Sequence, residues 1–350
     1  MTDGASGYAE EIGERDAAQG ARCTAIDPAS PLLYLGESDI TALGLEPDAC
    51  RDAIADAFRA RSEGRAIMLP AVHIDLAPGH GFRSLCAAWP DAGVACGKWL
   101  GVRPVEPHSS TPGVNALITL SDADTGLPVA MISANRLTGL RTAAMSTLAA
   151  QTLADPAADT IGFVGCGLQA QFHLEAMRAL FPSIRRVLAL SRTRRSAQVF
   201  ADAARAMGLD AQTCDDPQTI VRASRLLVTS VPLGPDAQPV LDPRWLQPGS
   251  FVSAIDLARS WTPRHLRTIE VIVTDDHEQQ ATLPPLSAEL GPKGSFDADL
   301  AELASGRFRP GSGTGRAMFF FRGSALADLA IALLAWRRAC ERGIGTHLPR

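Results

Sequence analysis

The feature that most restricts the fold of this chain is a change of rhythm after Ala157, where short apolar runs begin to alternate with amphipathic stretches. Such runs are typical of strands buried on both faces, and the stretches between them are typical of crossover helices. The segments that follow this pattern are residues 160–164, 169–180, 186–190, 196–207, 225–230, 251–255 and 271–273. We therefore predict an α/β fold whose second part is a Rossmann-type, doubly wound parallel sheet.

The residues before this point predict a different kind of structure. Residues 113–120 and 127–132 alternate between apolar and polar side chains, and the segment between them is dense in turn-forming residues, which predicts a β-hairpin. An alanine-rich segment at 137–153 favours a long helix that ends near Pro156. This first part is therefore expected to be an α+β unit.

The chain length and the position of the last helical segment set the expected domain organisation. A chain of 350 residues exceeds what one hydrophobic core usually organises. The helical stretch 324–342 comes too late to extend the parallel sheet, so we expect it to pack back on the first domain. The expected units are a flexible tail at 1–26, a discontinuous α+β domain at 27–150 and 320–350, and the parallel-sheet domain at 151–319.

Composition excludes several classes of protein. The net charge of −5 provides no basic surface for nucleic acid or an anionic membrane. The seven cysteines include neither a C-x-x-C pair nor a compact Cys/His cluster, which predicts free thiols and no metal site. The N-terminal segment lacks the features of a secretory signal, and the apolar stretch 325–336 is interrupted by Asp328 and too short to cross a bilayer. We expect a soluble cytoplasmic protein that acts on small molecules.

A glycine-rich turn follows the first strand of the predicted parallel sheet and directly precedes a helix. It reads Gly165-Cys-Gly167-Leu168-Gln169-Ala170. Gly165 permits a tight turn, Gly167 lets the backbone approach a pyrophosphate, and Ala170 stands where a third glycine would allow close helix–strand packing. The pattern predicts that these residues bind a dinucleotide. The alternative is a glycine-containing turn without a ligand.

The end of the second predicted strand indicates which dinucleotide is preferred. An Asp or Glu here would bind the ribose 2′-hydroxyl of NAD, but the chain reads Ser191-Arg192-Thr193-Arg194-Arg195. An arginine with a neighbouring hydroxyl can instead bind a 2′-phosphate through charge-assisted hydrogen bonds. We therefore predict that Ser191, Arg192 and Thr193 contact the cofactor and that NADP(H) is favoured over NAD(H). Arg194 and Arg195 can equally be solvated residues that open a surface helix.

Five short motifs are distributed along the chain. They are Gly97-Lys98-Trp99 and the segments at 124–128, 140–144, 165–170 and 323–328. In order and spacing they resemble the ornithine cyclodeaminase/mu-crystallin family, and the likeness extends over residues 31–348. The resemblance implies a homodimer in which the N-terminal domain, completed by the C-terminal helix, pairs the subunits and supplies substrate contacts to a Rossmann domain.

The resemblance also implies roles for individual residues. Lys98 corresponds to a lysine that meets the carboxylate of an amino acid or assists proton transfer, and Arg141 and Thr142 correspond to a pair that reaches the cofactor phosphates. An ammonium group suits a carboxylate, and an arginine suits a phosphate that it can bind in a bidentate manner. The alternatives are that Lys98 caps a strand at the surface and that Arg141 is an ordinary charge on a helix surface.

The carboxyl ends of two later strands are the expected position of the nicotinamide, because ligands of open α/β sheets bind at that edge. Thr229, Ser230 and Val231 end one strand, and Asp256 follows the next. We predict that the first three line the cofactor site. Asp256 is predicted to act as general acid or base, or to stabilise an iminium cation; the alternative is a helix N-cap.

The chain departs from the cyclodeaminase pattern in three places. Cyclodeaminases carry a catalytic Asp in a Gly-Gly-Asp context, whereas Asp256 comes earlier, in an Asp-Leu pattern like that of siderophore-pathway amino-dicarboxylate dehydrogenases of the family. A late Asp-Ser-Thr-Gly motif is replaced by Phe320-Phe321-Arg322-Gly323, in which Arg322 is a candidate substrate contact or a surface residue. The basic residue expected after Pro70 is not evident in the sequence up to His73.

These features predict an NAD(P)-dependent oxidoreductase that acts on the C–N bond of a small amino acid or cyclic imino acid, as a ketimine reductase or amino-acid dehydrogenase would. Ser191-Arg192-Thr193 also resembles the Asn-Arg-Thr of mu-crystallin, an NADPH-dependent ketimine reductase. Two alternatives stay open. One is cyclisation of ornithine with loss of ammonia and internally recycled NAD, and the other is a dinucleotide-binding protein without turnover.

Overall fold

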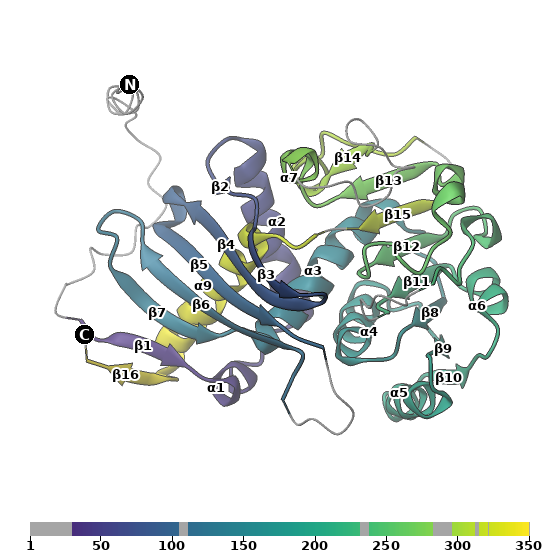
Figure 1. The fold of residues 1–350 in the computed structure, drawn as a ribbon, viewed down its shortest axis with the longest axis horizontal. Coiled ribbons are helices and arrows are strands. Elements are labelled where there is room, and N and C mark those ends of the chain that lie inside the picture. The colour runs from purple at the N-terminus through teal and green to yellow at the C-terminus, as the bar shows by residue number, and fades with distance from the viewer. Residues whose placement is uncertain are drawn as a thin grey trace.

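The computed structural model describes residues 30–104, 111–231, 238–282, 296–311, 315–320 and 322–349, so the predicted tail at 1–26 lies outside the described residues. The chain forms two sheets that lie side by side, with the long helix α3 (Asn135–Leu153) between them (Figure 1). The strands of the parallel sheet all come after residue 157, where the apolar rhythm changes, and those of the mixed sheet come before it, except for the last strand of the chain, residues 346–348.

The second sheet has eight strands in the order β10-β9-β8-β11-β12-β15-β13-β14, and all of its pairings are parallel. Its strands are β8 (Thr160–Val164), β9 (Arg186–Leu190), β10 (Asp210–Thr213), β11 (Leu226–Thr229), β12 (Phe251–Ala254), β13 (Val271–Thr274), β14 (Ala298–Asp299) and β15 (Ala317–Phe320). Its helices are α4 (Leu168–Leu180), α5 (Arg194–Ala206), α6 (Pro217–Ala223), α7 (His277–Thr282) and α8 (Leu300–Ala304), with 3-10 turns at η2 (Pro243–Trp245) and η3 (Pro263–Thr268). The predicted doubly wound parallel sheet is confirmed.

The first sheet is mixed, in the order β16-β1-β7-β6-β5-β4-β2, with β3 paired to β4. Its strands are β1 (Leu32–Leu35), β2 (Ile67–Met68), β3 (Val72–Ala77), β4 (His80–Trp89), β5 (Val94–Val102), β6 (Val114–Asp122), β7 (Pro128–Ser133) and β16 (Thr346–Leu348). Helices α1 (Glu37–Ala42) and α2 (Pro47–Ser62) and the 3-10 turn η1 (Pro90–Ala92) lie between these strands in the chain. β6 and β7 form the predicted antiparallel hairpin.

The last helix, α9 (Ala325–Arg342), packs on β4, β5 and β6 of the first sheet. Ser324 caps its first turn, accepting a hydrogen bond from the amide of Ala327, and Gly343 ends it in a left-handed conformation with φ 62°. Residues far apart in the chain therefore share one core. Within the described ranges, none of the helices is both long and apolar enough to cross a membrane.

Helix α3 is buried on nearly all sides, and its alanines and Gly139 allow other elements to approach closely. A Cβ atom on Gly139 would lie 2.2 Å from the ring of Phe172 in α4, so any side chain at position 139 would collide with this ring. α3 therefore contacts the first sheet on one side and the helix that follows the glycine turn on the other. Helix α3 therefore links the first sheet, which contains Lys98, with the glycine turn that precedes α4.

Candidate active site

Lys98 lies in β5 and points into the protein rather than toward solvent. Lys98 is 1% exposed, and its Nζ atom donates hydrogen bonds to Thr138 Oγ1 at 2.7 Å and to Asp328 Oδ1 at 2.8 Å. Nε of Arg141 lies 3.2 Å from the same Asp328 oxygen. The alternative in which Lys98 caps a strand at the surface is therefore wrong. Arg141 is 8% exposed, so the alternative in which it is an ordinary charge on a helix surface is also wrong.

The three charged groups form a buried cluster. Lys98 and Arg141 both contact the carboxylate of Asp328. Burial lowers the pKa of Lys98, and the negative charge of Asp328 opposes this shift. An ammonium and a guanidinium held at one place are groups that suit a carboxylate ligand.

The role of Asp328 was missed by the sequence reasoning, which noted it as an interruption of an apolar stretch and as the last residue of the 323–328 motif, without assigning it any chemistry. The signal was present, because Asp328 is surrounded in sequence by Ala325, Leu326, Ala327 and Leu329. An acidic residue within an apolar helical stretch is expected to be buried, and a buried carboxylate needs a partner of opposite charge. What the sequence lacks is the identity of that partner, since Lys98 lies on a strand 230 residues earlier.

The glycine turn has the geometry that its sequence predicts. Gly165 adopts φ +95°, and a Cβ atom on it would lie 2.7 Å from the carbonyl of Ser230. Ser230 Oγ donates to Gly165 O at 2.9 Å, so the predicted residue Ser230 supports the turn directly. A Cβ on Gly167 would meet nothing within 4 Å, which leaves the backbone open on that side.

The start of α4 fits the pyrophosphate of a dinucleotide. Gly167 is the N-cap of this helix and provides no side-chain hydrogen bond to the first amides, those of Leu168 and Gln169. Ala170 is fully buried, as close helix–strand packing requires. Among the described residues, the buried side-chain oxygen of Gln169 has no hydrogen-bond partner. The amides, the open space and the unused acceptor together are what a bound dinucleotide would use.

The end of β9 lies directly beside this turn, because the amide of Gly165 donates to Leu190 O at 2.8 Å. Ser191 and Arg192 follow Leu190 and are partly or fully exposed. Thr193 caps α5, where its Oγ1 accepts from the amide of Ser196 at 3.2 Å. The side chain of Arg194 is 77% exposed and lies 3.8 Å from Asp215, which agrees with the alternative of a solvated helix start.

Asp256 follows β12 and is buried, with 3% of its surface exposed. Its Oδ1 atom accepts a hydrogen bond from Thr229 Oγ1 at 2.9 Å, and its Oδ2 atom has no hydrogen-bond partner in the described part of the chain. Burial raises the pKa of Asp256, and the polar groups of Ser260 and Thr229 oppose this shift. The carboxyl group therefore holds a proton more readily than an exposed Asp does.

The turn after Asp256 is strained. Leu257 and Ala258 both adopt left-handed conformations, with φ 58° and 54°, although neither is glycine. Consecutive residues in this region are uncommon and occur preferentially at functional sites. Val231, the last of the predicted cofactor residues, is partly buried. It follows β11, the strand that pairs with β12, and the strained turn follows β12.

A buried network of polar side chains connects α3 with β12 and with α4. Ser253 Oγ in β12 donates to Ser146 Oγ in α3 at 2.7 Å, and Ser146 Oγ lies 2.9 Å from Nε2 of His173 in α4. His173 Nδ1 lies 2.8 Å from the carbonyl oxygen of Gln169 and must donate to it. Nε2 is therefore an acceptor and the ring is neutral, and burial lowers the pKa of His173 to about 4. The sequence reasoning assigned His173 no role.

Arg322 lies in the connection from β15 to α9. Its amide and that of Gly323 each donate to Asp275 Oδ2 at 3.2 Å, and its Nε atom donates to Gln280 Oε1 at 3.0 Å. Gln279 in turn donates to Gly323 O at 3.1 Å. Arg322 is partly buried, and its backbone belongs to a tightly held segment that leads to the helix bearing Asp328.

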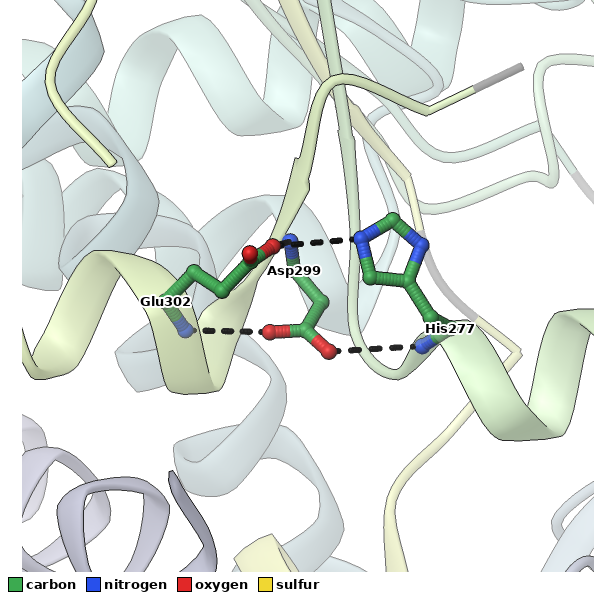
Figure 2. Close-up of side chains that lie close together, drawn as sticks. All are labelled: His277, Asp299 and Glu302. Carbon is green, nitrogen blue, oxygen red and sulfur yellow. Dashed lines mark hydrogen bonds and ion pairs between the residues drawn. The ribbon is translucent and has the colours of Figure 1, made fainter. Parts of the chain in front are cut away.

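A cluster away from these groups brings together His277, Asp299 and Glu302, whose potential ligand atoms lie within 4.8 Å of one another (Figure 2). Asp299 and Glu302 form a reciprocal capping box at the start of α8, and Asp299 Oδ2 also accepts from the amide of His277 at 3.4 Å. His277 Nε2 lies 3.1 Å from Glu302 Oε2. Each of these side chains is already used in capping and joining α7 and α8, so the arrangement is explained as structural.

Comparisons with known proteins agree with this geometry. The sequence model of the ornithine cyclodeaminase/mu-crystallin family matches residues 38–275, and the chain belongs to this family. An alanine dehydrogenase of Archaeoglobus fulgidus is 29% identical over 329 residues, which cover 90% of this chain and 98% of that protein. Ketimine reductase mu-crystallin of Mus musculus is 28% identical over 234 residues, which cover 66% of this chain and 72% of that protein.

The solved structure of an archaeal alanine dehydrogenase dimer with bound NAD has a TM-score of 0.81 to this chain at 28% identity. The alignment covers 91% of this chain and 98% of that one, so both sheets are included in the likeness. The family and the fold class that the sequence predicted are confirmed.

Replacing Asp328 by Asn tests the buried cluster. The substitution leaves Lys98 and Arg141 without their shared counter-charge, and we expect the free energy of unfolding to fall by about 3–5 kcal/mol. Urea denaturation measures this loss. The matched control is Asp202→Asn, since Asp202 forms an exposed pair with Arg205 and its loss should change stability by less than about 1 kcal/mol. Equal effects of the two substitutions would contradict the assignment.

The buried His173 predicts a specific loss of stability in acid. The unfolded chain takes up a proton at this ring below pH 6.5, whereas the folded protein does so only near pH 4, so stability falls as the pH falls between these values. Between about pH 7 and pH 4.5 this group alone should remove about 2–3 kcal/mol. Urea unfolding of the protein and of His173→Gln at both pH values measures the difference. An identical pH dependence in the two proteins would show that His173 titrates normally.

Proposed function

We propose that the protein is an NAD(P)-dependent oxidoreductase that acts on the C–N bond of a small amino or imino acid. The observation that carries this proposal is the arrangement around α3, which places a buried charged cluster beside one side of the helix and a glycine turn suited to a dinucleotide beside the other. The activity predicted from the sequence agrees with the relatives, which include an alanine dehydrogenase and a ketimine reductase.

The cofactor proposal follows from the open start of α4. Gly165, Gly167 and the amides of Leu168 and Gln169 would hold the pyrophosphate, and Ser230 would keep the turn in shape. A bound dinucleotide supplies or accepts the hydride. We propose that NADP(H) is preferred, because Arg192 is exposed beside the turn and the positions around it lack a carboxylate that would repel a 2′-phosphate.

The substrate carboxylate is proposed to bind at the cluster of Lys98 and Arg141. The sequence resemblance placed Arg141 with the cofactor phosphates, but its ion pair with Asp328 groups it with Lys98. The hydroxyl of Thr142, the other residue of that pair, donates to Thr138 O at 2.7 Å within the helix. A carboxylate at this position could pair with the ammonium of Lys98 and the guanidinium of Arg141.

Asp256 is proposed to exchange a proton with the substrate nitrogen. Reduction converts the C=N double bond of the imino acid into a C–N single bond, and the nitrogen then takes one proton from Asp256. The overall change is imino acid, NAD(P)H and a proton in, and amino acid and NAD(P)⁺ out. The raised pKa of Asp256 supports this role.

The experiment that tests this function combines cofactor binding with a substrate panel. Fluorescence titration with NADPH and NADH measures binding, and absorbance of the reduced nicotinamide measures turnover with cyclic imines and with 2-oxo acids plus ammonia. Net oxidation of the cofactor supports the proposal. Ornithine converted to proline and ammonia without net cofactor change would indicate the cyclodeaminase reaction, and binding without any turnover would indicate an accessory protein.

Replacing Lys98 by Met should reduce turnover by about 100-fold or more while cofactor affinity stays near that of the unmodified protein. Met fills most of the volume of the buried lysine, and Asp328 keeps Arg141 as a partner. Steady-state kinetics and the fluorescence titration measure the two properties separately. A parallel loss of cofactor binding would show that Lys98 does not act on the substrate.

Replacing Arg192 by Asp should shift the ratio of kcat/KM for NADPH over NADH by at least about tenfold toward NADH, because the new carboxylate repels a 2′-phosphate. Arg194→Asp is the matched control, since that side chain is 77% exposed at the start of α5. Comparable shifts in both variants, or no shift in Arg192→Asp, would remove the basis for the proposed preference.

We also propose that the protein is a homodimer that pairs through the outer face of the first sheet. This face exposes large apolar side chains, among them Val72 at 65%, Ile74 at 49%, Trp99 at 49% and Leu117 at 43%. Trp99 lies opposite Leu117 on the neighbouring strand and stacks on Phe82 with ring centroids 5.3 Å apart. An apolar sheet face of this kind is normally covered by another molecule.

Trp99→Glu should convert the dimer into a monomer, because it buries a charge in the proposed interface. Size-exclusion chromatography with light scattering measures the mass. Val199→Glu is the matched control, since Val199 is 60% exposed on α5, far from this sheet. A monomeric unmodified protein, or a dimer that survives Trp99→Glu, would rule out this interface.

A further inference from the structure

Asp275 is a buried carboxylate that the proposed chemistry does not use. It follows β13 in the second sheet, and its side chain is fully removed from solvent. Its Oδ2 atom accepts hydrogen bonds from the amides of Arg322 and Gly323 and from Nε2 of Gln279, each at 3.2 Å. Burying a charge is costly, so a carboxylate at this position needs a reason beyond filling space.

The groups that contact this carboxylate in the described part of the chain are donors. Besides the three donors to Oδ2, the Oδ1 atom accepts hydrogen bonds from Thr274 Oγ1 and from the amide of Asp276, each at 3.1 Å. Burial and the charge of Asp276 raise the pKa of Asp275 to about 6, so the group is ionised at about pH 8. Both oxygens of a carboxylate accept, whereas an asparagine in its place would turn an NH₂ group toward other donors.

The backbone that Asp275 holds lies where the chain crosses from the second sheet to the first. β15 belongs to the parallel sheet, and α9, which follows Arg322 and Gly323, packs on the mixed sheet (Figure 1). Gln279 of α7 also donates to Gly323 O at 3.1 Å. The amide and the carbonyl of Gly323 are therefore both fixed by residues of the second sheet and its helices.

Gly323 lies beside the guanidinium group of Arg141. It adopts φ 112°, a conformation that favours glycine, and a Cβ atom on it would lie 3.7 Å from Nη2 and 3.9 Å from Nη1 of Arg141. Ser324 comes next and caps α9, and its carbonyl accepts from the amide of Asp328 at 3.2 Å. The backbone beside Arg141 and the carboxylate that pairs with it thus belong to one short segment, which Asp275 holds at its start.

The turn after β13 is attached to the first part of the chain at a second place. Asp276 and Glu278 both pair with Nη2 of Arg61 in α2, at 3.3 Å and 2.7 Å. The charge of Asp275 also acts on the guanidinium of Arg322, where it raises the pKa in opposition to burial. The turn is therefore a fixed support, and a change at Asp275 is expected to move the crossing segment rather than the turn.

We propose that Asp275 is a positioning residue for the substrate carboxylate, because it fixes Gly323 and the start of α9 and through them the places of Arg141 and Asp328. This inference rests on the proposed function, in which the carboxylate binds at Lys98 and Arg141. Asp275 itself touches neither of these cations in any of the contacts described above. A displacement of about 1 Å in groups that orient a substrate can lower turnover by about 100-fold.

Replacing Asp275 by Asn keeps the shape of the side chain and changes its pattern of donors and acceptors. At about pH 8 we expect the KM for the imino acid preferred in the substrate panel to rise by at least about tenfold and kcat to fall by less than about threefold. The Kd for NADPH should stay within about twofold, because β11, β12 and β15 separate β13 from β8 and its glycine turn. Steady-state kinetics and fluorescence titration measure these values.

Asp242→Asn is the matched control for a general loss of stability. Asp242 is also a buried carboxylate of the second part, and it binds Arg244 and His265 rather than the crossing segment. This control should lower the melting temperature and leave KM unchanged. Gln279→Met is a milder second variant that removes the hydrogen bonds from Gln279 to Asp275 and Gly323, and it should raise KM by about 3–10-fold.

The outcomes separate the inference from the proposed function. A rise in KM in Asp275→Asn and Gln279→Met, but not in Asp242→Asn, with unchanged NADPH affinity supports the inference. An unchanged KM in the first two variants, an equal rise in the control or a parallel loss of NADPH affinity contradicts the positioning role and leaves the oxidoreductase proposal intact. If Asp275→Asn does not fold, Gln279→Met decides. Absence of turnover by the unmodified protein on the whole panel contradicts the proposed function and this inference with it.

Discussion

The buried contact between Lys98 and Asp328 is the constraint on which the rest of the structure depends. An ammonium and a carboxylate that are both almost fully removed from solvent are stable only as partners, so the strand and the helix that carry them have a fixed relative position. Thr138 binds the same ammonium, and this fixes the first turns of α3 against both. The proposed place for a substrate carboxylate is thereby defined by groups that are held before any ligand binds.

Helix α3 also fixes the position of the parallel-sheet part of the protein relative to Lys98 and Asp328. The residue after Thr138 is Gly139, whose missing side chain lets Phe172 of α4 approach, and two turns later Ser146 joins His173 and Ser253. The helix that starts at the glycine turn and the strand that leads to Asp256 are therefore both held by α3. Small and hydroxyl side chains along one buried helix thus set the distance between the proposed substrate and cofactor positions.

The sequence was sufficient to predict the elements that are defined by patterns among neighbouring residues. The strand at Thr160–Val164, the glycine turn after it and the hairpin of β6 and β7 all follow from apolar runs, turn residues and periodicity. It was insufficient where a group depends on a distant partner. Asp328 for Lys98 and Ser146 for His173 are partners that only the folded chain brings together, and neither spacing nor composition contains that information.

The order of the strands in the first sheet has a consequence for how the two sheets are completed. β1, near the start, is paired with β16, at the end, and the helix that carries Asp328 lies between β15 and β16. Residues 317–348 supply β15 to the middle of the parallel sheet and α9 and β16 to the first sheet, so both sheets are completed by the same late segment. Loss of this segment would leave both sheets incomplete and Lys98 without its carboxylate partner, which would expose a charged interior to proteases.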